Sequence, residues 1–466
     1  MCEKCDPIQP PIQRTVSRRE LMRYGMSAAA AGALLASPLR HAIADDNGPG
    51  TAAGTDQMDV SIANRGKAKQ VILLFMSGGA SHLDTFDPKP GASTQGDTRA
   101  IDTAVSGVKI AKTLPGIAKR MGDIALIRGM TSKEGNHERA RYLMHTGYAP
   151  TPTVVHAGLG SIVSHEMGSK DAALPEYIAI NGPGARPGYM GVHHAPFAIQ
   201  VRAPDGGQDE RGRRQQGGGR GGPVVQNLVL PTGMTKDRRD ARVGFMEKLN
   251  ARFGKDHDKS IAEAQSAMFA RARRLMDTPQ NTAFDIASEK PETIARYGKT
   301  RFGMGCLMAR RLIDEGVKCV EVMMGGWDTH DDGFNRVRTL NEQLDPAVVA
   351  LMDDLKASGK LDETLIVWVG DFGRTPRIDT GRNGRGHYPR AWSAWLAGGG
   401  VQGGRVLGKT DAKGETVTDG HVKPEDFYAS IAHATGIDAT KTFYTGQGRP
   451  IQIVYKDGRV VKDLFA

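Results

Sequence analysis

The mature part of this sequence is poor in cysteine. Of its four cysteines, Cys2 and Cys5 fall in an N-terminal segment that we expect to be removed. Only Cys306 and Cys319 then remain, and two cysteines cannot make the framework of a small disulfide-rich protein. We expect both to be buried thiols, with a single disulfide as the alternative.

The sequence also lacks a hydrophobic run long enough to cross a bilayer, which takes about 20 residues. The apolar run MSAAAAGALLA follows the twin-arginine pattern Ser17-Arg18-Arg19 and precedes the small-x-small site Ala42-Ile43-Ala44. This order is typical of a twin-arginine signal peptide. We therefore predict that residues 1–44 direct export and are removed, which leaves a periplasmic or cell-surface protein with no transmembrane span.

An excess of acidic residues is absent too, since the formal net charge is +10. Part of the basic excess lies in a Gly/Arg-rich insertion at about 203–223, which contains GGQDERGRRQQGGGRGG. Such a composition cannot pack a core, so we expect a solvated loop here and no nucleic-acid partner in an exported protein. Residues 45–67 are polar and predict a linker, and residues 68–466 are expected to form the folded domain.

Short apolar runs rich in β-branched residues alternate with helical patterns along this domain. We expect strands at residues 70–76, 124–127, 177–180, 317–324 and 364–369. Helical patterns lie at residues 114–121, 137–145, 157–167, 262–276, 299–315, 337–358 and 424–435. The alternation predicts an α/β fold around a mostly parallel sheet. Near the C-terminus, GGGVQGGRVLG, GETVTDG and IQIVYKDGRVV predict short hairpins.

Polar residues follow three of the expected strands at the point where each strand ends. The segments are SGGASHLD after the first strand, GGWDTH after residues 317–324 and GDFGRTPR after residues 364–369. In open parallel sheets, ligands bind beyond the carboxyl ends of the strands. The side chains that we single out there are Asp328, His330, Asp371 and, in the loop GRGHY, His387.

Two carboxylates and two imidazoles form a ligand set that suits zinc, manganese or iron better than calcium. Each residue alone would indicate no more than a turn, a helix cap or an ordinary histidine. Because all four follow converging strands, we predict a divalent metal site.

A second group of polar residues follows the strand at residues 124–127. Thr131 and Ser132 precede a helix that we expect to begin near Asn136 or His137, with Arg141 on its first turns. Free N–H groups at a helix start bind anions such as phosphate or sulfate. The alternative is a simple N-cap by Asn136.

Long motifs in these segments resemble a known family. The motifs SGGASHLDTFDPKP, NHERARYLMHTG, GGWDTH, GDFGRTPR and GRGHYPRAWSAWLAGGGVQGG resemble the bacterial family labelled domain of unknown function 1501, exported proteins related to the alkaline phosphatase and sulfatase superfamily. The resemblance covers nearly all of the mature chain. It implies an alkaline phosphatase-like, three-layer α/β/α fold, a metal site at the strand ends and hydrolysis of phosphate or sulfate esters.

The resemblance also implies roles for individual residues. Asp328 and His330 resemble an Asp-x-x-x-His ligand pair, Asp371 the Asp of an Asp-His-Gly motif, and His387 the last histidine ligand. His137 falls where sulfatases carry the cysteine that becomes their nucleophile. These correspondences predict catalysis next to the metal.

The sequence departs from the superfamily pattern at several of these positions. Ser77 stands where an Asp is usual, Phe372 replaces the His of Asp-His-Gly, and no cysteine occupies the nucleophile position. The departures predict one ion, zinc or manganese, instead of two. The nucleophile would then be Thr131, Ser132 or a water molecule on the metal.

Two functions follow from these observations. The first is a metal-dependent hydrolase of phosphate or sulfate esters, with His137 or His82 as proton donor and with the anion held by Asn136, Arg141, Arg374 and Ser77. The second is a non-catalytic exported protein on the same scaffold that recognises an anionic glycan or a partner protein. A purely structural role at the cell surface would follow only if the strand-end residues did not converge.

Overall fold

The computed structural model describes residues 64–169, 171–203, 230, 232–256 and 259–465. The predicted signal peptide, most of the predicted linker and the Gly/Arg-rich insertion from residue 204 onward lie outside these residues. All described residues belong to one compact unit. Within it, no helix is both long and apolar enough to cross a membrane.

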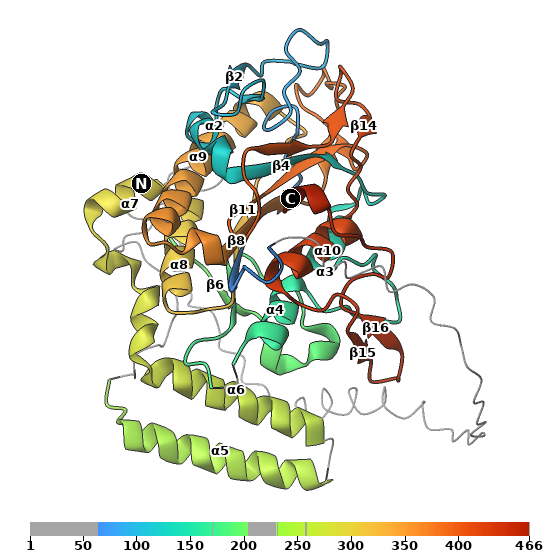
Figure 1. Cartoon of the computed structure of the whole chain (residues 1–466). Helices are drawn as coiled ribbons and strands as arrows, with labels where there is room; N and C mark the ends of the chain where they lie inside the picture. The colour runs from blue at the N-terminus through green and yellow to red at the C-terminus, as the bar shows by residue number, and fades with distance from the viewer. Residues whose placement is uncertain (1–63, 170, 204–229, 231, 257–258, 466) are drawn as a thin grey trace, which may run out of the picture. The chain divides into compact units, whose positions relative to one another are not determined.

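An eight-stranded sheet organises the described chain (Figure 1). Its spatial order is β12-β4-β11-β8-β1-β7-β5-β6, and every neighbouring pair is parallel except those made by β11. The strands are β1 Gln70–Met76, β4 Ile124–Met130, β5 Tyr177–Ile180, β6 Phe197–Ile199, β7 Cys319–Met324, β8 Thr364–Gly370, β11 Trp392–Ala397 and β12 Arg405–Leu407. The predicted mostly parallel sheet is confirmed.

Helices cover both faces of this sheet. The helices are α2 Pro115–Arg120, α3 His137–Thr146, α4 Leu159–Met167, α5 Lys236–Asp256, α6 Lys259–Asp277, α7 Pro291–Tyr297, α8 Arg301–Asp314, α9 Gly333–Ala357 and α10 Pro424–Thr435. Short 3₁₀ turns lie at Met121–Asp123, Gly188–Met190, Val192–His194, Pro279–Phe284, Ile286–Ser288, Leu361–Glu363 and Lys462–Leu464.

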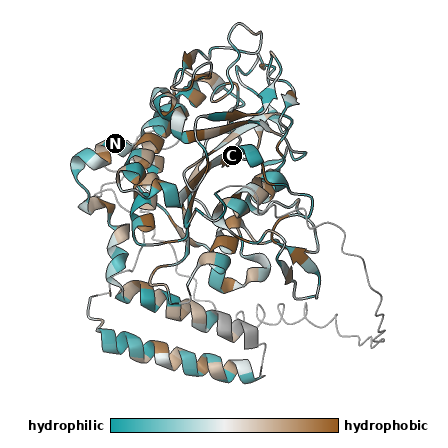
Figure 2. Cartoon of the chain, in the orientation of Figure 1, coloured by the Kyte–Doolittle hydropathy of each residue, from teal (hydrophilic) through white to brown (hydrophobic). Residues whose placement is uncertain are grey.

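The alternation of side chains along β1 shows how the layers divide. Ile72, Leu74 and Met76 pack in a core with α2, α8 and α9. Val71, Leu73 and Phe75 point to the other face and pack with α3, α4 and α10. Because a strand buried on both faces has no polar side, β1 is a continuous apolar run. Figure 2 shows the hydrophobic colour concentrated in the central strands. The predicted three-layer α/β/α arrangement is confirmed.

Four small antiparallel pairs surround the main sheet. They are β2 Ala100–Asp102 with β3 Lys109–Ala111, β9 Gly373–Arg374 with β10 His387–Tyr388, β13 Lys409–Thr410 with β14 Val417–Asp419, and β15 Thr442–Tyr444 with β16 Pro450–Gln452. The hairpin predicted around GETVTDG is confirmed. The one predicted within IQIVYKDGRVV is wrong, since Ile451 and Gln452 belong to β16, which pairs with the preceding strand β15, and no strand follows at residues 453–461. The segment GGGVQGGRVLG is different, since its strand β12 joins the main sheet parallel to β4.

Both cysteines of the described chain are buried free thiols. Cys319 lies on β7 and Cys306 on α8. Burial raises the pKa of both thiols far from neutrality. The predicted buried thiols are confirmed, and neither is available for chemistry at the surface.

Candidate metal centre

The loops after β1, β7 and β8 leave the sheet at one edge. Met76, the last residue of β1, is level with Met324 on β7 and with Gly370 on β8. The next residues then form a tight turn in which Gly78 has a φ of +109°, and a Cβ at this glycine would lie 2.4 Å from the backbone nitrogen of Asp328. Only glycine lets the two loops approach this closely.

Three imidazoles converge on one carboxylate oxygen at this edge. The Nε2 atoms of His137, His330 and His387 lie 3.3, 3.2 and 3.4 Å from Oδ1 of Asp328. The Nε2 atoms of His330 and His387 are 2.9 Å apart. The ligand atoms of His137, Asp328 and His387 all lie within 4.8 Å of one another, a group that could hold a metal ion.

The other ring nitrogen of two of these histidines is held in place. Nδ1 of His137 is 2.8 Å from Oδ2 of Asp371, and Nδ1 of His387 is 2.8 Å from the carbonyl of Gly135. Because carboxylates and carbonyls only accept hydrogen bonds, both Nδ1 atoms carry the proton, and in the neutral rings Nε2 keeps its lone pair. Histidine ligands of metals are oriented in the same manner.

Nε2 of His137 is buried and has no hydrogen-bond partner among the described residues. A buried nitrogen that makes no bond costs free energy unless another group satisfies it. Its neighbour Asp371 is completely buried and also accepts the N–H of Gly78 at 3.0 Å. Asp371 therefore lies behind His137, as its hydrogen-bond partner.

Asp328 stays ionised at any ordinary pH. Burial alone would raise its pKa, but the hydrogen bond and charge of Arg374, with His137 and His330, hold the pKa at about 2. The bond between Asp371 and His137 outweighs burial and raises the pKa of His137, whereas burial and Arg374 lower that of His330. The site offers a permanent negative charge among nitrogen donors, which suits a divalent cation.

Arg374 is itself a buried structural element of the site. Its guanidinium donates to the carbonyls of Gly78, Gly79 and Arg385, and to Asp328. Most of its donors are therefore satisfied by the chain, although the sequence predicted it as a ligand for a substrate anion.

A cavity of about 390 Å³ opens beside the imidazole cluster, and its lining includes two arginines. Arg141 reaches it from α3 and donates to Oγ of Ser77 at 3.3 Å, while its buried Nε has no partner in the described chain. Arg336 comes from the first turns of α9 and donates to the carbonyl of Gly326 at 3.0 Å. The lining residues are Ser77, Gly78, His137, Arg141, Gly326, Asp328 and Arg336. Two guanidinium groups beside a cation site can hold an oxyanion.

Other predicted residues lie outside this cavity. His82 is buried, its Nε2 is 2.9 Å from the carbonyl of Gly414, and burial lowers its pKa. Thr131 and Ser132 donate their backbone N–H groups to Val422 and Pro389. Asn136 caps α3, and its side chain accepts the N–H groups of Glu138 and Arg139. Two of the N–H groups that we expected to bind an anion are therefore taken by the cap.

Arg336 was missed in the sequence because it follows no strand directly. It lies eight positions after Asp328, early in a helix, where arginine usually serves as a solvated residue. One feature of the sequence could have indicated it. Arg336 lies in the first turn of the helix that follows GGWDTH, and this turn is close to the end of the preceding strand.

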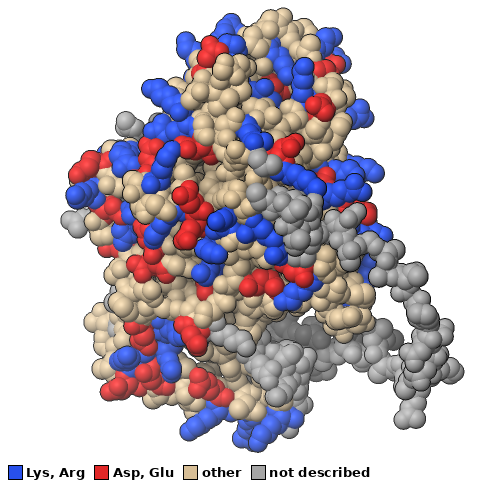
Figure 3. Space-filling view, in the orientation of Figure 1, with Lys and Arg blue, Asp and Glu red and all other residues tan. Residues whose placement is uncertain are grey.

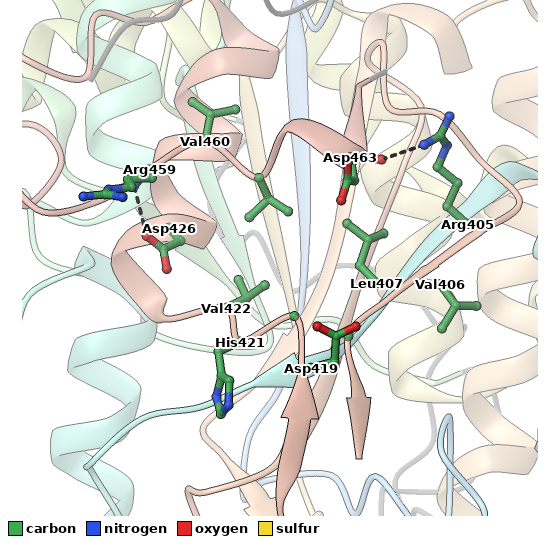
Figure 4. A pocket seen from close by; sticks show the side chains of 13 residues that line it. Arg405, Val406, Leu407, Asp419, His421, Val422, Asp426, Arg459, Val460 and Asp463 are labelled. Carbon is green, nitrogen blue, oxygen red and sulfur yellow. Dashed lines mark hydrogen bonds between the residues drawn. The ribbon is translucent and has the colours of Figure 1, made fainter. Parts of the chain in front are cut away.

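A larger cavity, of about 610 Å³, lies elsewhere, beside β12 and α10. Figure 4 shows Asp426 with Arg459 on one side of it and Asp463 with Arg405 on the other. Asp426 accepts the backbone N–H groups of Lys423 and Arg459 and so holds the start of α10. These charged groups do not converge, so we place the candidate chemistry at the strand ends.

A family model described as "Protein of unknown function (DUF1501)" matches residues 68–465. No functionally curated protein matches the sequence.

Three solved structures have a similar chain path. They are the sulfatase PsFucS1 from Pseudoalteromonas sp. (14% identity, 85% of this chain and 72% of that chain covered, TM-score 0.37), the lipoteichoic acid synthase LtaP from Listeria monocytogenes (10%, 87% and 78%, 0.37) and an alkaline phosphatase from the Antarctic bacterium TAB5 (11%, 80% and 99%, 0.32). Likenesses at this level concern the chain path alone, so the case for function rests on the site.

Proposed function

This chain belongs to the DUF1501 family, and we propose that it is an exported, metal-dependent hydrolase of phosphate or sulfate esters. The twin-arginine pattern at Arg18 and Arg19 supports export to the periplasm or cell surface. Cell fractionation that finds only the full-length, unprocessed chain, and finds it in the cytoplasm, would remove the export part of the proposal.

The observation that carries the proposal is the spacing of ligand atoms around Asp328. Zinc–nitrogen bonds of about 2.0–2.1 Å in a tetrahedral site set neighbouring ligand atoms about 3.3 Å apart. The distances from Oδ1 of Asp328 to the three Nε2 atoms are 3.2 to 3.4 Å. These three distances, with the buried Nε2 of His137 that makes no hydrogen bond, support a bound cation, and the 2.9 Å between the Nε2 atoms of His330 and His387 would have to widen for both to bind it.

We assign His137, Asp328 and His387 as ligands and His330 as a further ligand at the rim. Asp371 then acts through His137, because its carboxylate fixes the ring that the metal would use. This assignment revises the hypothesis from the sequence, in which Asp371 was a ligand and His137 a catalytic group. A bound divalent cation would supply Lewis-acid polarisation of the ester and lower the pKa of a nearby water.

The substrate would be an anionic ester held by Arg141 and Arg336. Both guanidinium groups line the same small cavity as Asp328. Their N–H donors match the oxygens of phosphate or sulfate, and charge-assisted bonds of this kind are about twice as strong as neutral ones. The anion would thus be fixed next to the cation.

A hydrolysis assay with a matched pair of arginine variants tests the proposal. The mature chain, reconstituted with zinc or manganese, should hydrolyse para-nitrophenyl phosphate or sulfate. Arg141→Ala should lower kcat/KM by about tenfold or more, because one charged contact to the anion is lost. The control is Arg139→Ala on the same helix, whose side chain is exposed and pairs with Glu134. Equal activity in the two variants would contradict the assigned anion site.

One observation favours the second candidate, a non-catalytic protein that binds an anionic glycan or a partner protein. Among the described cavity residues, Ser77 alone carries a hydroxyl group, and that hydroxyl already accepts a bond from Arg141. Binding of inorganic sulfate or phosphate that Arg141→Ala weakens, without turnover of either ester by the metal-loaded chain, would favour this reading.

A further inference from the structure

The helical hairpin formed by α5 and α6 presents a second feature, unrelated to the metal centre. α5 packs along α6. Arg239 is buried there and pairs with Asp277 of α6 at 2.7 Å, and Asn250 is buried with its amide 3.3 Å from Oγ of Ser266. These two residues mark the side of α5 that faces its partner helix.

The outward side of α5 carries large apolar residues. Phe245 is 62% exposed, Leu249 45% and Phe253 45%. Single exposed apolar residues are ordinary on protein surfaces. Three within two turns of one helix form a continuous patch, which marks an interaction surface more often than an isolated side chain does.

Arginines flank this patch along the helix. Positions 238, 242, 245, 249 and 252 recur at intervals of four and three residues, so they fall on one face of a helix with about 3.6 residues per turn. Arg238 and Arg242 therefore precede Phe245 and Leu249 on that face, and Arg252 follows them. In the described chain, no acidic side chain pairs with these three exposed arginines. Lys and Arg side chains lie along the lower edge of Figure 3, over α5.

We propose that this face of α5 docks on an anionic lipid surface. A helix that lies in the membrane interface places aromatic and aliphatic residues among the acyl chains and basic residues at the headgroups. On this face of α5, Phe245 and Leu249 lie between Arg242 and Arg252, so the long arginine side chains can reach headgroups while the apolar residues enter the acyl region. The helix would lie on the bilayer and would not cross it.

The charge pattern distinguishes this occupant from a second copy of the chain. If two copies met through the same stripe, Arg238, Arg242 and Arg252 would be brought together with Asp256 as the acidic residue in register with them on α5, so like charges would predominate and repel. An anionic surface neutralises all three. Each basic residue near such a surface contributes about 1 kcal/mol of attraction.

Vesicle flotation tests the proposal with the full mature chain. The chain should bind vesicles of phosphatidylcholine mixed with phosphatidylglycerol, bind vesicles of phosphatidylcholine alone weakly, and lose binding as salt is raised. Leu249→Glu should reduce the partition coefficient by at least about tenfold, and Arg242→Gln by about fivefold. The matched control is Ala251→Glu, which adds the same charge to an exposed position on another side of α5.

Circular dichroism and the thermal midpoint show whether each variant folds. Failure of the folded, unaltered chain to float with the anionic vesicles would overturn the proposal, as would equal losses in Leu249→Glu and Ala251→Glu. If the chain does not bind vesicles but forms a concentration-dependent dimer that Leu249→Glu dissociates, this face of α5 binds a second copy of the chain and not a membrane.

Discussion

Glu321 is a fully buried carboxylate on the central strand β7, and both of its oxygens are bonded. Oε1 is 3.0 Å from Nε2 of His145, and Oε2 accepts the hydroxyl of Tyr177 at 2.6 Å. Nδ1 of His145 lies 2.8 Å from the carbonyl of Arg141. The pair thus links β7, which leads to Asp328, to α3, which carries His137 and Arg141, so a buried ion pair fixes the two elements that build the site.

The pH dependence of stability should report this pair. Burial alone would lower the pKa of His145 and raise that of Glu321, but their mutual charge and hydrogen bond reverse both effects. Because the pKa of His145 is raised on folding, its contribution is complete below the usual value of 6.5 and is lost as pH rises through the folded pKa. Because that of Glu321 is lowered, its contribution is complete above 4.5 and is lost as pH falls through the folded pKa. The pair therefore stabilises most between these two values.

Glu321→Gln should lower the free energy of unfolding by about 3 kcal/mol in this window, since it leaves His145 buried without its counter-charge. The loss should shrink above the folded pKa of His145, where the imidazole is neutral in the unaltered chain too. Urea unfolding at several pH values measures this difference. Glu342→Gln, at an exposed position on α9, should cost little, and a loss in Glu321→Gln that does not vary with pH would exclude the ion pair as its cause.

At the scale of elements, the turn after β1 brings the sheet edge and the β7 loop together. Gly78→Ala should cost more than about 2 kcal/mol of stability and should also weaken metal binding, because the new Cβ would displace Asp328. Gly107→Ala is the matched control. Its φ of +76° carries a similar strain but nothing lies within 4 Å of the added Cβ, so we expect a loss of about 1 kcal/mol and normal metal content. Thermal unfolding and metal analysis of both variants measure these effects. Equal losses of stability, with normal metal content in both variants, would show that the turn does not position Asp328.

The elements themselves could be predicted where the local pattern decides them. Strands such as β5 and β8 are buried on both faces, so each is an unbroken apolar run. The segment around β12 was assigned to a hairpin because its glycines indicate turns, but its strand pairs with β4, a partner distant in the sequence. β11, the antiparallel strand of the main sheet, was not predicted at all, although Trp392–Ala397 is fully buried.

The residues of the site could likewise be predicted only where the local sequence decides their place. Asp328, His330 and His387 could be found because each follows a strand or lies in a glycine-rich loop, and the structure brings them together. That His137 points its Nε2 into the group, with Asp371 behind it, depends on how α3 packs across the strand ends. Sequence spacing carries no information about that packing, so the partners of His137 could not be assigned from it.

At the scale of the whole molecule, the metal centre joins parts of the chain that are far apart in sequence. His137 comes from α3, Asp328 and His330 from the loop after β7, and His387 from β10. A cation that binds only the folded chain stabilises it in proportion to the logarithm of the free metal concentration. The site would therefore bind the ends of α3, β7 and β10 together, in addition to any chemistry that it performs.

The metal content of the purified mature chain tests this account most directly. Elemental analysis should find about one zinc or manganese ion per chain in the unaltered protein and in Asp331→Ala, and less than about a tenth of that in Asp328→Ala. Asp331 is the matched control, since it lies in the same loop and its exposed carboxylate is 3.6 Å from Arg382. Absence of stoichiometric metal from the folded, unaltered chain, even after reconstitution, would contradict the metal centre and the hydrolase that depends on it.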